Sequence, residues 1–461
     1  MIRAPSSNVP GSAWQMPRWV IFLNSRAGFR CLLVLFAAIV LVFSVVPLVN
    51  HFAGRGAKDY ALWYNTGQLI VHGQEIYPPR HHTFPFMYPP FAAALLAPVS
   101  LLGQAGLIGA LVLVNCAAWF VSIVLSVRLA TGQSGRQHAL LYLIPNLVIV
   151  VYAWSNFLLG QPSLVLLAIM LGGFFCLGQK RNWWAGLLFA LAAAIKAFPV
   201  LAIIYLIYRR YWIAAASMLV SLALLLLVLP ISFRGFEQSW RDLTKWTDGM
   251  LLKYDEEGVA QRPGRSVTWK NQSIFGVANR LLRKTDINEP KKPHIPKPGD
   301  SPELLEREAH QPPHVAIYVN FLDLPFKTVN LVILASALCL GLFYVLVMPA
   351  SSLRSSASDA IEWALLIILI LIFAPLSFGY LYAWLLYPFV VVTQRLLIAP
   401  SGRLLSLTVS ALALLAFTIP SPKLAQTYGD IFFASLLLFI GLALELRNLE
   451  PTAAVSDAAH V

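Results

Sequence analysis

Asp59 is the only aspartate between Asn50 and Pro90, in a polar segment that is rich in aromatic and histidine residues. Its aromatic and imidazole side chains include those of Tyr60, Trp63, Tyr64, His72, Tyr77, His81, His82 and Tyr88. Aromatic faces stack on the C–H surfaces of sugars, and one carboxylate can serve as a general base. The segment therefore resembles the lining of a sugar-binding cleft. The alternative is a belt of interfacial aromatic residues with one solvated acid.

A second candidate is Lys196, which lies between two apolar stretches in Ala194-Ile-Lys-Ala-Phe-Pro199. An ionisable residue in that position indicates a functional site, unless its side chain only snorkels to the membrane interface. Amides and aromatic residues occur in three comparable segments, Gly160-Gln161, Asn271-Gln-Ser273 and Ala374–Tyr380. These groups suit chemistry on a lipid-tethered substrate at the outer membrane face. They suit an ion-coupled transporter less well, because that would need ionisable groups at mid-depth.

The composition shows which elements must position these groups. The chain has 461 residues, of which 58% are hydrophobic and 12% are charged, with 34 Lys+Arg against 21 Asp+Glu. Soluble domains contain about 25% charged residues, so a water-soluble globule is excluded, and so is a disordered chain. A nucleic-acid-binding protein is excluded because the basic excess accompanies apolar runs. The remaining class is a polytopic membrane protein with all-α architecture.

The four cysteines and the carboxylates give no sign of a metal or redox centre. Each cysteine lies in or beside an apolar stretch, which excludes a disulfide framework and a Cys/His metal site. No acidic cluster suits Mg²⁺ or Mn²⁺. We therefore predict no cofactor and no tightly held metal.

Apolar runs of the length that a spanning helix needs predict about twelve transmembrane helices. They are Cys31–Val49, Ala105–Val127, Ala139–Trp154, Leu164–Gly178, Trp183–Ile195, Phe198–Tyr208, Trp212–Pro230, Val329–Met348, Ile361–Phe373, Tyr380–Val392, Leu404–Ile419 and Ile431–Leu446. Phe91–Leu102 is apolar but short, and we interpret it as re-entrant or interfacial. The first run has no small-x-small cleavage site after it, so we expect a retained helix rather than a signal peptide.

The distribution of cations predicts the orientation. With the N-terminus in the cytoplasm, the short basic loops all fall on the inner side, as the positive-inside rule requires. Their cations are Arg128, Arg136, Lys180, Arg181, Arg209, Arg210, Arg354, Arg395, Arg403 and Arg447. The prediction is a cytoplasmic tail at 1–30, a membrane domain at 31–446 with outer loops at 50–90 and 232–325, and a cytoplasmic tail at 447–461. Met1–Gln15 and Thr452–Val461 are expected to be loose, and the Pro- and charge-rich tract Asn288–Asp300 to be irregular and exposed.

The order of the motifs resembles glycosyltransferase family 87, multi-spanning enzymes of the GT-C superfamily that include polyprenyl-phosphate-mannose-dependent α-mannosyltransferases. The similarity extends from about Asp59 to Tyr382. The matching motifs are Asp59 with Tyr60–Tyr64, Gly73-Gln-Glu-Ile-Tyr77, Tyr88-Pro-Pro90, Gly160-Gln161, Ala185-Gly-Leu187, Lys196-Ala-Phe-Pro199 and Asn271-Gln-Ser273. One segment departs from the family pattern, because Phe378 and Tyr380 stand where the family often has Trp and His.

The resemblance implies a GT-C-like fold and an inverting transfer of a sugar, most often mannose, from a polyprenyl-phosphate donor. The acceptor would be a glycolipid or a cell-envelope glycan at the outer face of the cell membrane. Asp59 would be the general base. Residues that would bind the donor phosphate or sugar are Lys196, Gln161, Asn271, Gln272, Tyr64, Tyr88, His81 and Tyr380. Two alternatives remain open: a transporter or flippase for a lipid-linked sugar, and a non-catalytic partner in envelope polysaccharide assembly.

Overall fold

Each apolar run of the sequence forms a helix, because a helix satisfies its backbone hydrogen bonds within one segment. The computed structural model describes residues 17–56, 58–77, 86–256, 258–260, 266–288 and 315–449. The helices of the first half are α1 (Arg18–Asn24), α2 (Arg26–Phe52), α3 (Asp59–Val71), α4 (Pro90–Ser100), α5 (Gly103–Thr131), α6 (Leu140–Leu159), α7 (Ser163–Gly178), α8 (Asn182–Ile195), η1 (Phe198–Leu201), α9 (Ala202–Tyr208), α10 (Trp212–Ala223), η2 (Leu224–Val228) and α11 (Leu229–Arg234).

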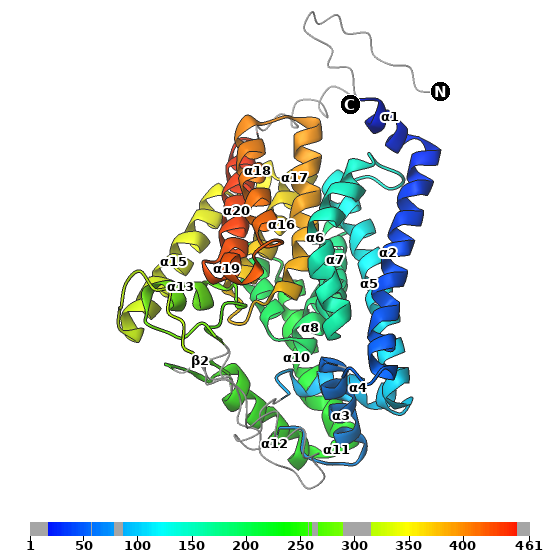
Figure 1. The fold of residues 1–461 in the computed structure, drawn as a ribbon, viewed down its shortest axis with the longest axis vertical. Coiled ribbons are helices and arrows are strands. Elements are labelled where there is room, and N and C mark those ends of the chain that lie inside the picture. The colour runs from blue at the N-terminus through cyan, green and yellow to red at the C-terminus, as the bar shows by residue number, and fades with distance from the viewer. Residues whose placement is uncertain are drawn as a thin grey trace, which may run out of the picture.

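The second half begins with a mixed segment and ends with further long helices (Figure 1). Its elements are α12 (Phe236–Trp246), η3 (Thr247–Leu251), β1 (Tyr254–Asp255), β2 (Gly258–Val259), α13 (Ile274–Leu282), α15 (Phe326–Val347), η4 (Ser351–Leu353), α16 (Ser356–Phe373), η5 (Gly379–Leu385), α17 (Leu386–Ile398), α18 (Gly402–Phe417), α19 (Pro422–Thr427) and α20 (Asp430–Arg447). The two strands pair antiparallel, with Tyr254 opposite Val259.

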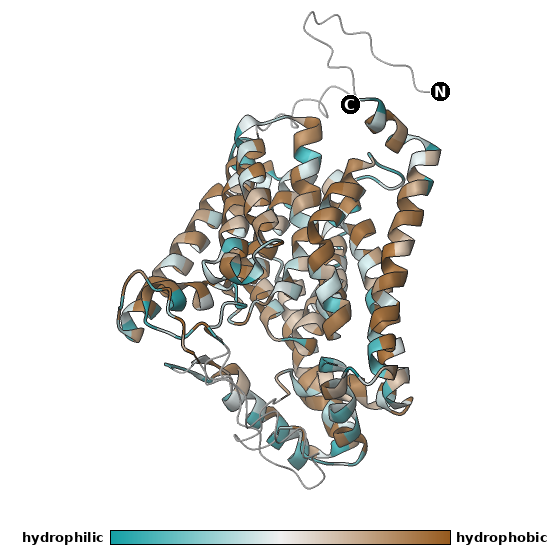
Figure 2. Cartoon of the chain, viewed as in Figure 1, coloured by the Kyte–Doolittle hydropathy of each residue, from teal (hydrophilic) through white to brown (hydrophobic). Residues whose placement is uncertain are grey.

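The prediction of an all-α polytopic membrane protein is confirmed. In the part of the chain that the structure describes, seven helical segments are long and apolar enough to cross a membrane. Five shorter apolar helices accompany them, and the hydropathy colouring of Figure 2 shows apolar residues throughout the bundle. Each of the twelve predicted spans is helical: nine coincide with one helix, and three with consecutive helical segments, namely η1–α9, α10–η2–α11 and η5–α17. Residues 18–30, which we assigned to the N-terminal tail, form α1 and the beginning of α2.

Helix α1 and the C-terminal end of α20 lie at the same end of the bundle, which Figure 1 draws at the top. Contacts among the basic loops agree with this arrangement, since Arg136 donates to the backbone oxygen of Asn24 and Arg209 pairs with Glu362. The α3–α4 pair lies at the opposite end. Because α2 ends there and α5 begins there, α4 does not cross the bundle, in agreement with the re-entrant or interfacial prediction.

The centre of the bundle is built from α16, η5 and α17. Most residues of α16 are buried, and a capping box formed by Ser355 and Ser358 fixes its start. Trp384 in η5 is fully buried and donates its indole N–H to the backbone oxygen of Ser163 at 2.8 Å. This core therefore holds the turn between α6 and α7 next to the segment that contains Tyr380.

The long segment between α11 and α15 contains structure that its composition did not predict. The amphipathic helix α12 is attached by a buried ion pair between Arg234 and Asp242, 2.9 Å apart. Burial raises the pKa of the Asp242 carboxyl, and the Arg234 guanidinium opposes that shift. The tract Asn288–Asp300, apart from Asn288, and both loose tails lie outside the described residues.

Candidate active site

The first turn of α3 positions Asp59. Its helix N-terminus favours a carboxylate there, because the helix dipole is positive at that end. The Tyr60 hydroxyl donates to the backbone oxygen of Phe157 at 2.7 Å, and the Trp63 indole donates to that of Gly160 at 2.7 Å. Burial raises the pKa of Tyr60, so its hydroxyl stays a donor. Two hydrogen bonds therefore attach the start of α3 to the end of α6.

Gly160 makes this attachment possible. Its φ of +74° is in the left-handed region, and a Cβ atom there would lie 2.9 Å from the Tyr60 ring. Only glycine combines that conformation with so close an approach. The turn ends α6 and directs the next residue, Gln161, toward α3.

Gln161 links Asp59 to Tyr88 through a directional hydrogen-bond chain. The Gln161 amide donates from Nε2 to Asp59 Oδ2 at 2.5 Å. The Tyr88 hydroxyl donates to Gln161 Oε1 at 2.7 Å. The Tyr88 backbone oxygen accepts from the Tyr77 hydroxyl at 2.6 Å, and complete burial raises the pKa of Tyr77 well above its usual value. Because Gln161 uses its N–H toward Asp59, the Oδ2 atom is the acceptor of this bond.

Lys196 lies on the other side of Tyr88. It follows the last residue of α8 in an extended conformation, which ends that helix. Its Nζ atom is 5.2 Å from the Tyr88 ring centroid and 5.0 Å from that of Tyr380. A third ring, that of Phe198, is 5.7 Å away. The cation is thus held among aromatic faces, an arrangement that stabilises it when it is partly withdrawn from water.

Asn156 ties the segment containing Tyr380 to the same site. Its Nδ2 atom donates to the Tyr380 backbone oxygen at 2.7 Å, and its Oδ1 atom accepts from the Ser163 backbone at 3.2 Å. Asn156 is completely buried. We had not included it among the site residues, although an asparagine in the last turn of an apolar helix was a usable signal. The structure therefore brings together Asp59, Gln161, Tyr88, Lys196 and Tyr380.

Asn271 and Gln272 lie in a different environment, where backbone groups bind the Asn271 amide and the Gln272 Nε2 atom, while Gln272 Oε1 is buried without a hydrogen-bond partner among the described residues. Asn271 Nδ2 donates to the backbone oxygens of Ser266 and Pro375, and Oδ1 accepts from the backbone of Ser273 and Ser377. Gln272 Nε2 donates to the backbone oxygens of Trp269 and Gln426. These bonds brace the turn before α13 against the turn after α16. The donor-binding role predicted for both residues stays a prediction.

Arg280 stabilises the same region with further hydrogen bonds. It is fully buried, and its guanidinium donates to four backbone oxygens, those of Thr268, Asn271, Gln426 and Thr427. Burial lowers its pKa to about 9, so it remains a cation at neutral pH. The sequence did not indicate that Arg280 would be buried, since a single arginine in a long polar segment is common.

The two other predicted site residues add little to the observed geometry. Tyr64 is half-buried in α3, one turn beyond Tyr60. His81 lies outside the described residues, so its predicted role stays a prediction. No group of three His, Cys, Asp or Glu side chains that could hold a metal ion occurs within the described residues.

Comparison with known proteins gives the context of this geometry. Residues 86–298 match glycosyltransferase family 87, which confirms the resemblance found in the motifs. Over 295 residues the chain is 29% identical to a polyprenol-phosphate-mannose-dependent alpha-(1-2)-phosphatidylinositol mannoside mannosyltransferase of Mycobacterium tuberculosis, covering 59% of this chain and 64% of that protein. It is 36% identical over 206 residues to a polyprenol-phosphate-mannose-dependent alpha-(1-2)-phosphatidylinositol pentamannoside mannosyltransferase of Mycolicibacterium smegmatis, covering 43% and 44%. No solved structure matches the chain.

The matched regions therefore span 43% to 64% of the relatives' own lengths. The family match includes Tyr88, Gln161 and Lys196. Asp59 and Tyr380 lie outside it and join the site through the contacts described above.

Proposed function

Because residues 86–298 belong to glycosyltransferase family 87, we propose that this chain transfers mannose from a polyprenyl-phosphate donor to a membrane-anchored glycan. The observation that carries the proposal is the convergence of one carboxylate, one lysine and two tyrosines from four distant segments. Asp59 comes from α3, Tyr88 from the segment before α4, Lys196 from the end of α8 and Tyr380 from η5. A base and a phosphate-binding cation are the two groups that such a transfer needs.

Lys196 is the proposed partner of the donor phosphate. The leaving group is a lipid phosphate, so its developing negative charge needs stabilisation more than it needs a general acid. The rings of Tyr88 and Tyr380 hold the ammonium group in place. The names of the mycobacterial relatives support the choice of polyprenol-phosphate-mannose as the donor.

Asp59 is the proposed general base. Gln161 occupies its Oδ2 atom, and within the described residues no hydrogen bond to Oδ1 is formed. Oδ1 takes the proton of the acceptor hydroxyl while that oxygen bonds to the anomeric carbon. The bond from this carbon to the phosphate oxygen breaks in the same displacement, and the polyprenyl phosphate leaves. A single displacement inverts the anomeric configuration.

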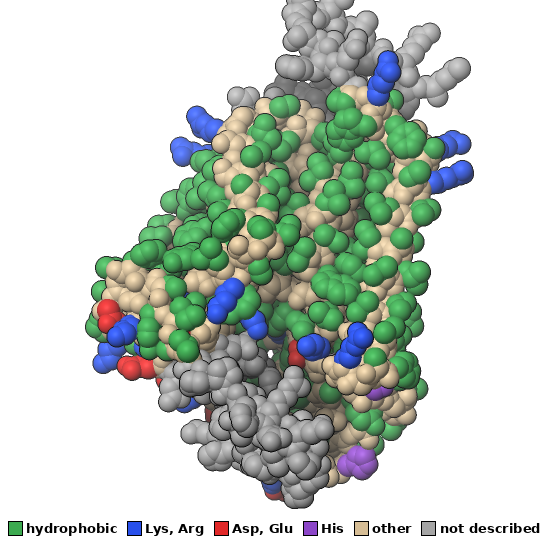
Figure 3. All heavy atoms as spheres, viewed as in Figure 1, with side chains coloured by type: hydrophobic (Ala, Val, Ile, Leu, Met, Phe, Trp, Pro, Cys, Tyr) green, Lys and Arg blue, Asp and Glu red, His purple; other side chains and the backbone are tan. Residues whose placement is uncertain are grey.

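The outer face of the membrane is the proposed location of the reaction. The α3–α4 end of the bundle lies opposite α1 and the C-terminal end of α20 (Figure 1). Arg136 contacts Asn24 at the end of α1, and Arg395 pairs with Glu445 near the end of α20. On the face that Figure 3 shows, acidic side chains occur only toward the α3–α4 end. The positive-inside rule then puts Asp59 outside the cytoplasm, where a lipid-linked donor replaces cytoplasmic nucleotide sugars.

The proposal is tested with the full chain in membranes, supplied with radiolabelled polyprenyl-phosphate mannose and a phosphatidylinositol mannoside as acceptor. The acceptor class follows the relatives' names. We expect label in a product one hexose heavier by mass spectrometry, with an anomeric configuration opposite to that of the donor. A product that retains the donor's configuration would refute the single displacement. Donor flipping without any transfer to this or other glycolipid acceptors would favour a transporter.

A further inference from the structure

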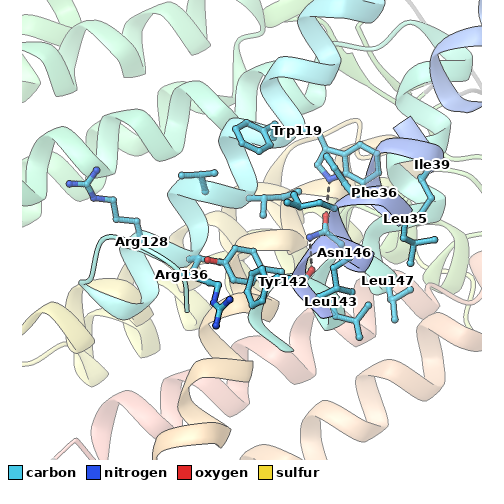
Figure 4. Close-up of a pocket in the computed structure, with 18 of the residues that line it drawn as sticks. Leu35, Phe36, Ile39, Trp119, Arg128, Arg136, Tyr142, Leu143, Asn146 and Leu147 are labelled. Carbon is cyan, nitrogen blue, oxygen red and sulfur yellow. Dashed lines mark hydrogen bonds between the residues drawn. The ribbon is translucent and has the colours of Figure 1, made fainter. Parts of the chain in front are cut away.

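A cavity lies at the opposite end of the bundle from Asp59, between α2, α5 and α6. Its volume is about 440 Å³, within the range of about 300–1,000 Å³ that is usual for ligand sites. Its walls are apolar side chains that include Leu35, Phe36, Val124 and Leu147, and Figure 4 shows several of them lining the cavity. Leu35, Val124 and Leu147 are also well exposed on the outside of the bundle. The cavity is therefore a groove that opens onto the membrane-facing surface.

Two arginines lie at the end of this groove that is nearer the chain termini. Arg136 donates to the backbone oxygen of Asn24 at 2.8 Å and lies over the Phe29 ring, 4.8 Å from its centroid. Arg128 lies 4.5 Å from the Phe175 ring centroid. Both side chains are exposed, and each guanidinium carries five N–H donors, more than these contacts use. Figure 4 shows both arginines beside the groove.

Within the part of the chain that the structure describes, no carboxylate balances these charges. No aspartate or glutamate occurs in α2 or anywhere from Ile76 to Phe236, so none comes from the helices that form the groove. The carboxylates described at the same end of the bundle have other partners: Glu362 pairs with Arg209, Asp359 with Arg354 and Glu445 with Arg395. Among the described residues, Arg128 and Arg136 are therefore left without a carboxylate partner, and an anionic ligand would balance their charge.

We propose that this groove binds an anionic phospholipid, with an acyl chain between α2 and the α5–α6 pair and the phosphate at Arg128 and Arg136. The apolar wall selects a lipid, since the groove opens onto the hydrocarbon region of the membrane. The unbalanced arginines select a negative headgroup, because basic residues near a membrane surface attract anionic lipids. The groove is lined by α2 residues between Phe29 and Ile39, so the remainder of that helix, to Phe52, separates the groove from the Asp59 end. The lipid is therefore not a substrate of the proposed transfer.

The test measures lipid binding by native mass spectrometry of the full chain, released from detergent with phosphatidylglycerol or phosphatidylcholine of identical acyl chains. We expect phosphatidylglycerol to bind more tightly than phosphatidylcholine. The double variant Arg128→Gln/Arg136→Gln should lower phosphatidylglycerol affinity about 30-fold, the effect of two arginines near a headgroup. The control Arg403→Gln/Arg447→Gln removes the same charge from exposed sites on α18 and α20. It should bind phosphatidylglycerol as the unmodified chain does.

A second pair of variants tests the apolar wall. Leu147→Trp fills the groove and should weaken phosphatidylglycerol binding, whereas Leu405→Trp, at a similarly exposed position on α18, should not. Equal binding of the two lipids, or equal losses in test and control variants, would overturn the proposal. Displacement of the lipid by millimolar inorganic phosphate would also overturn it, because the arginines would then bind phosphate without the groove.

Discussion

Replacing Asp59 with asparagine should abolish most of the transfer while leaving the fold and donor binding intact. The amide of asparagine has almost the same shape as the carboxylate, and its oxygen can still accept the Gln161 Nε2 hydrogen bond seen in the structure. It cannot take a proton from the acceptor hydroxyl near neutral pH. The substitution therefore removes one chemical step and keeps the contact that positions the residue.

The size of the effect follows from these contacts. A positioned general base contributes about 10²–10⁴-fold to a rate, or roughly 3–5 kcal/mol of barrier. The stability cost is smaller: Asp59 is only half-buried and loses a charge at a helix N-terminus, worth about 0.3–1 kcal/mol. Asp59→Glu should recover only part of the rate, because the extra methylene displaces the carboxylate from the site that Gln161 fixes.

The assay measures initial rates of mannose transfer in membranes with equal amounts of each variant, together with donor affinity. Glu75→Gln is the matched control, since Glu75 lies in the same outer segment but forms an exposed ion pair with Lys245. That pair contributes about 0–1 kcal/mol, so transfer should continue at a nearly normal rate. Near-normal transfer by Asp59→Asn would show that the base is another residue, and a large loss in Glu75→Gln would point to Glu75.

Three further predictions concern the groups around Asp59. Lys196→Met should raise the KM for the lipid donor at least tenfold with little loss of expression. The control Lys423→Met should leave that KM unchanged. Equal KM values for the two variants would show that the Lys196 side chain only snorkels to the membrane interface. Gly160→Ala should lower stability by more than about 1 kcal/mol in thermal unfolding, because its positive φ and the nearby Tyr60 ring disfavour a Cβ. Gly109→Ala, with open space around its Cβ position, is the control and should not destabilise. Asn271→Ala should lower the free energy of unfolding by about 2–4 kcal/mol, because it leaves buried backbone groups without partners. A variant that is as stable as the unmodified chain but has a raised KM for the donor would instead support donor binding by Asn271.

The helices could be predicted from the sequence because hydropathy alone determines which segments enter a membrane. Lys196 could be found for the same reason, since an isolated cation in an apolar run stands out. The partners of these residues could not be predicted. Nothing in the spacing of Tyr88, Gln161 and Lys196 shows that tertiary packing places the Tyr88 side chain between the other two.

Asn271 and Gln272 show a second limit of sequence reasoning. A polar motif in an outer segment looks the same whether its amides bind a ligand or brace a turn. The difference depends on backbone oxygens from distant segments, such as that of Pro375 with Asn271 and that of Gln426 with Gln272. Helix α12 was not predicted, because a surface helix in a long connection lacks the continuous apolar run by which the spanning helices were recognised.

The lengths of α7 and α8 have a consequence for the membrane around the site. With 16 and 14 residues, they measure about 24 and 21 Å, less than the roughly 30 Å of a bilayer's hydrocarbon core. Gln161 and Lys196, next to the ends of these helices, are therefore recessed below the membrane surface at the α3–α4 end, whereas α2 and α5 are long enough to reach it. Hydrophobic mismatch of this kind thins the surrounding bilayer. The mannosyl phosphate would then reach Lys196 without its polyprenyl chain leaving the outer leaflet.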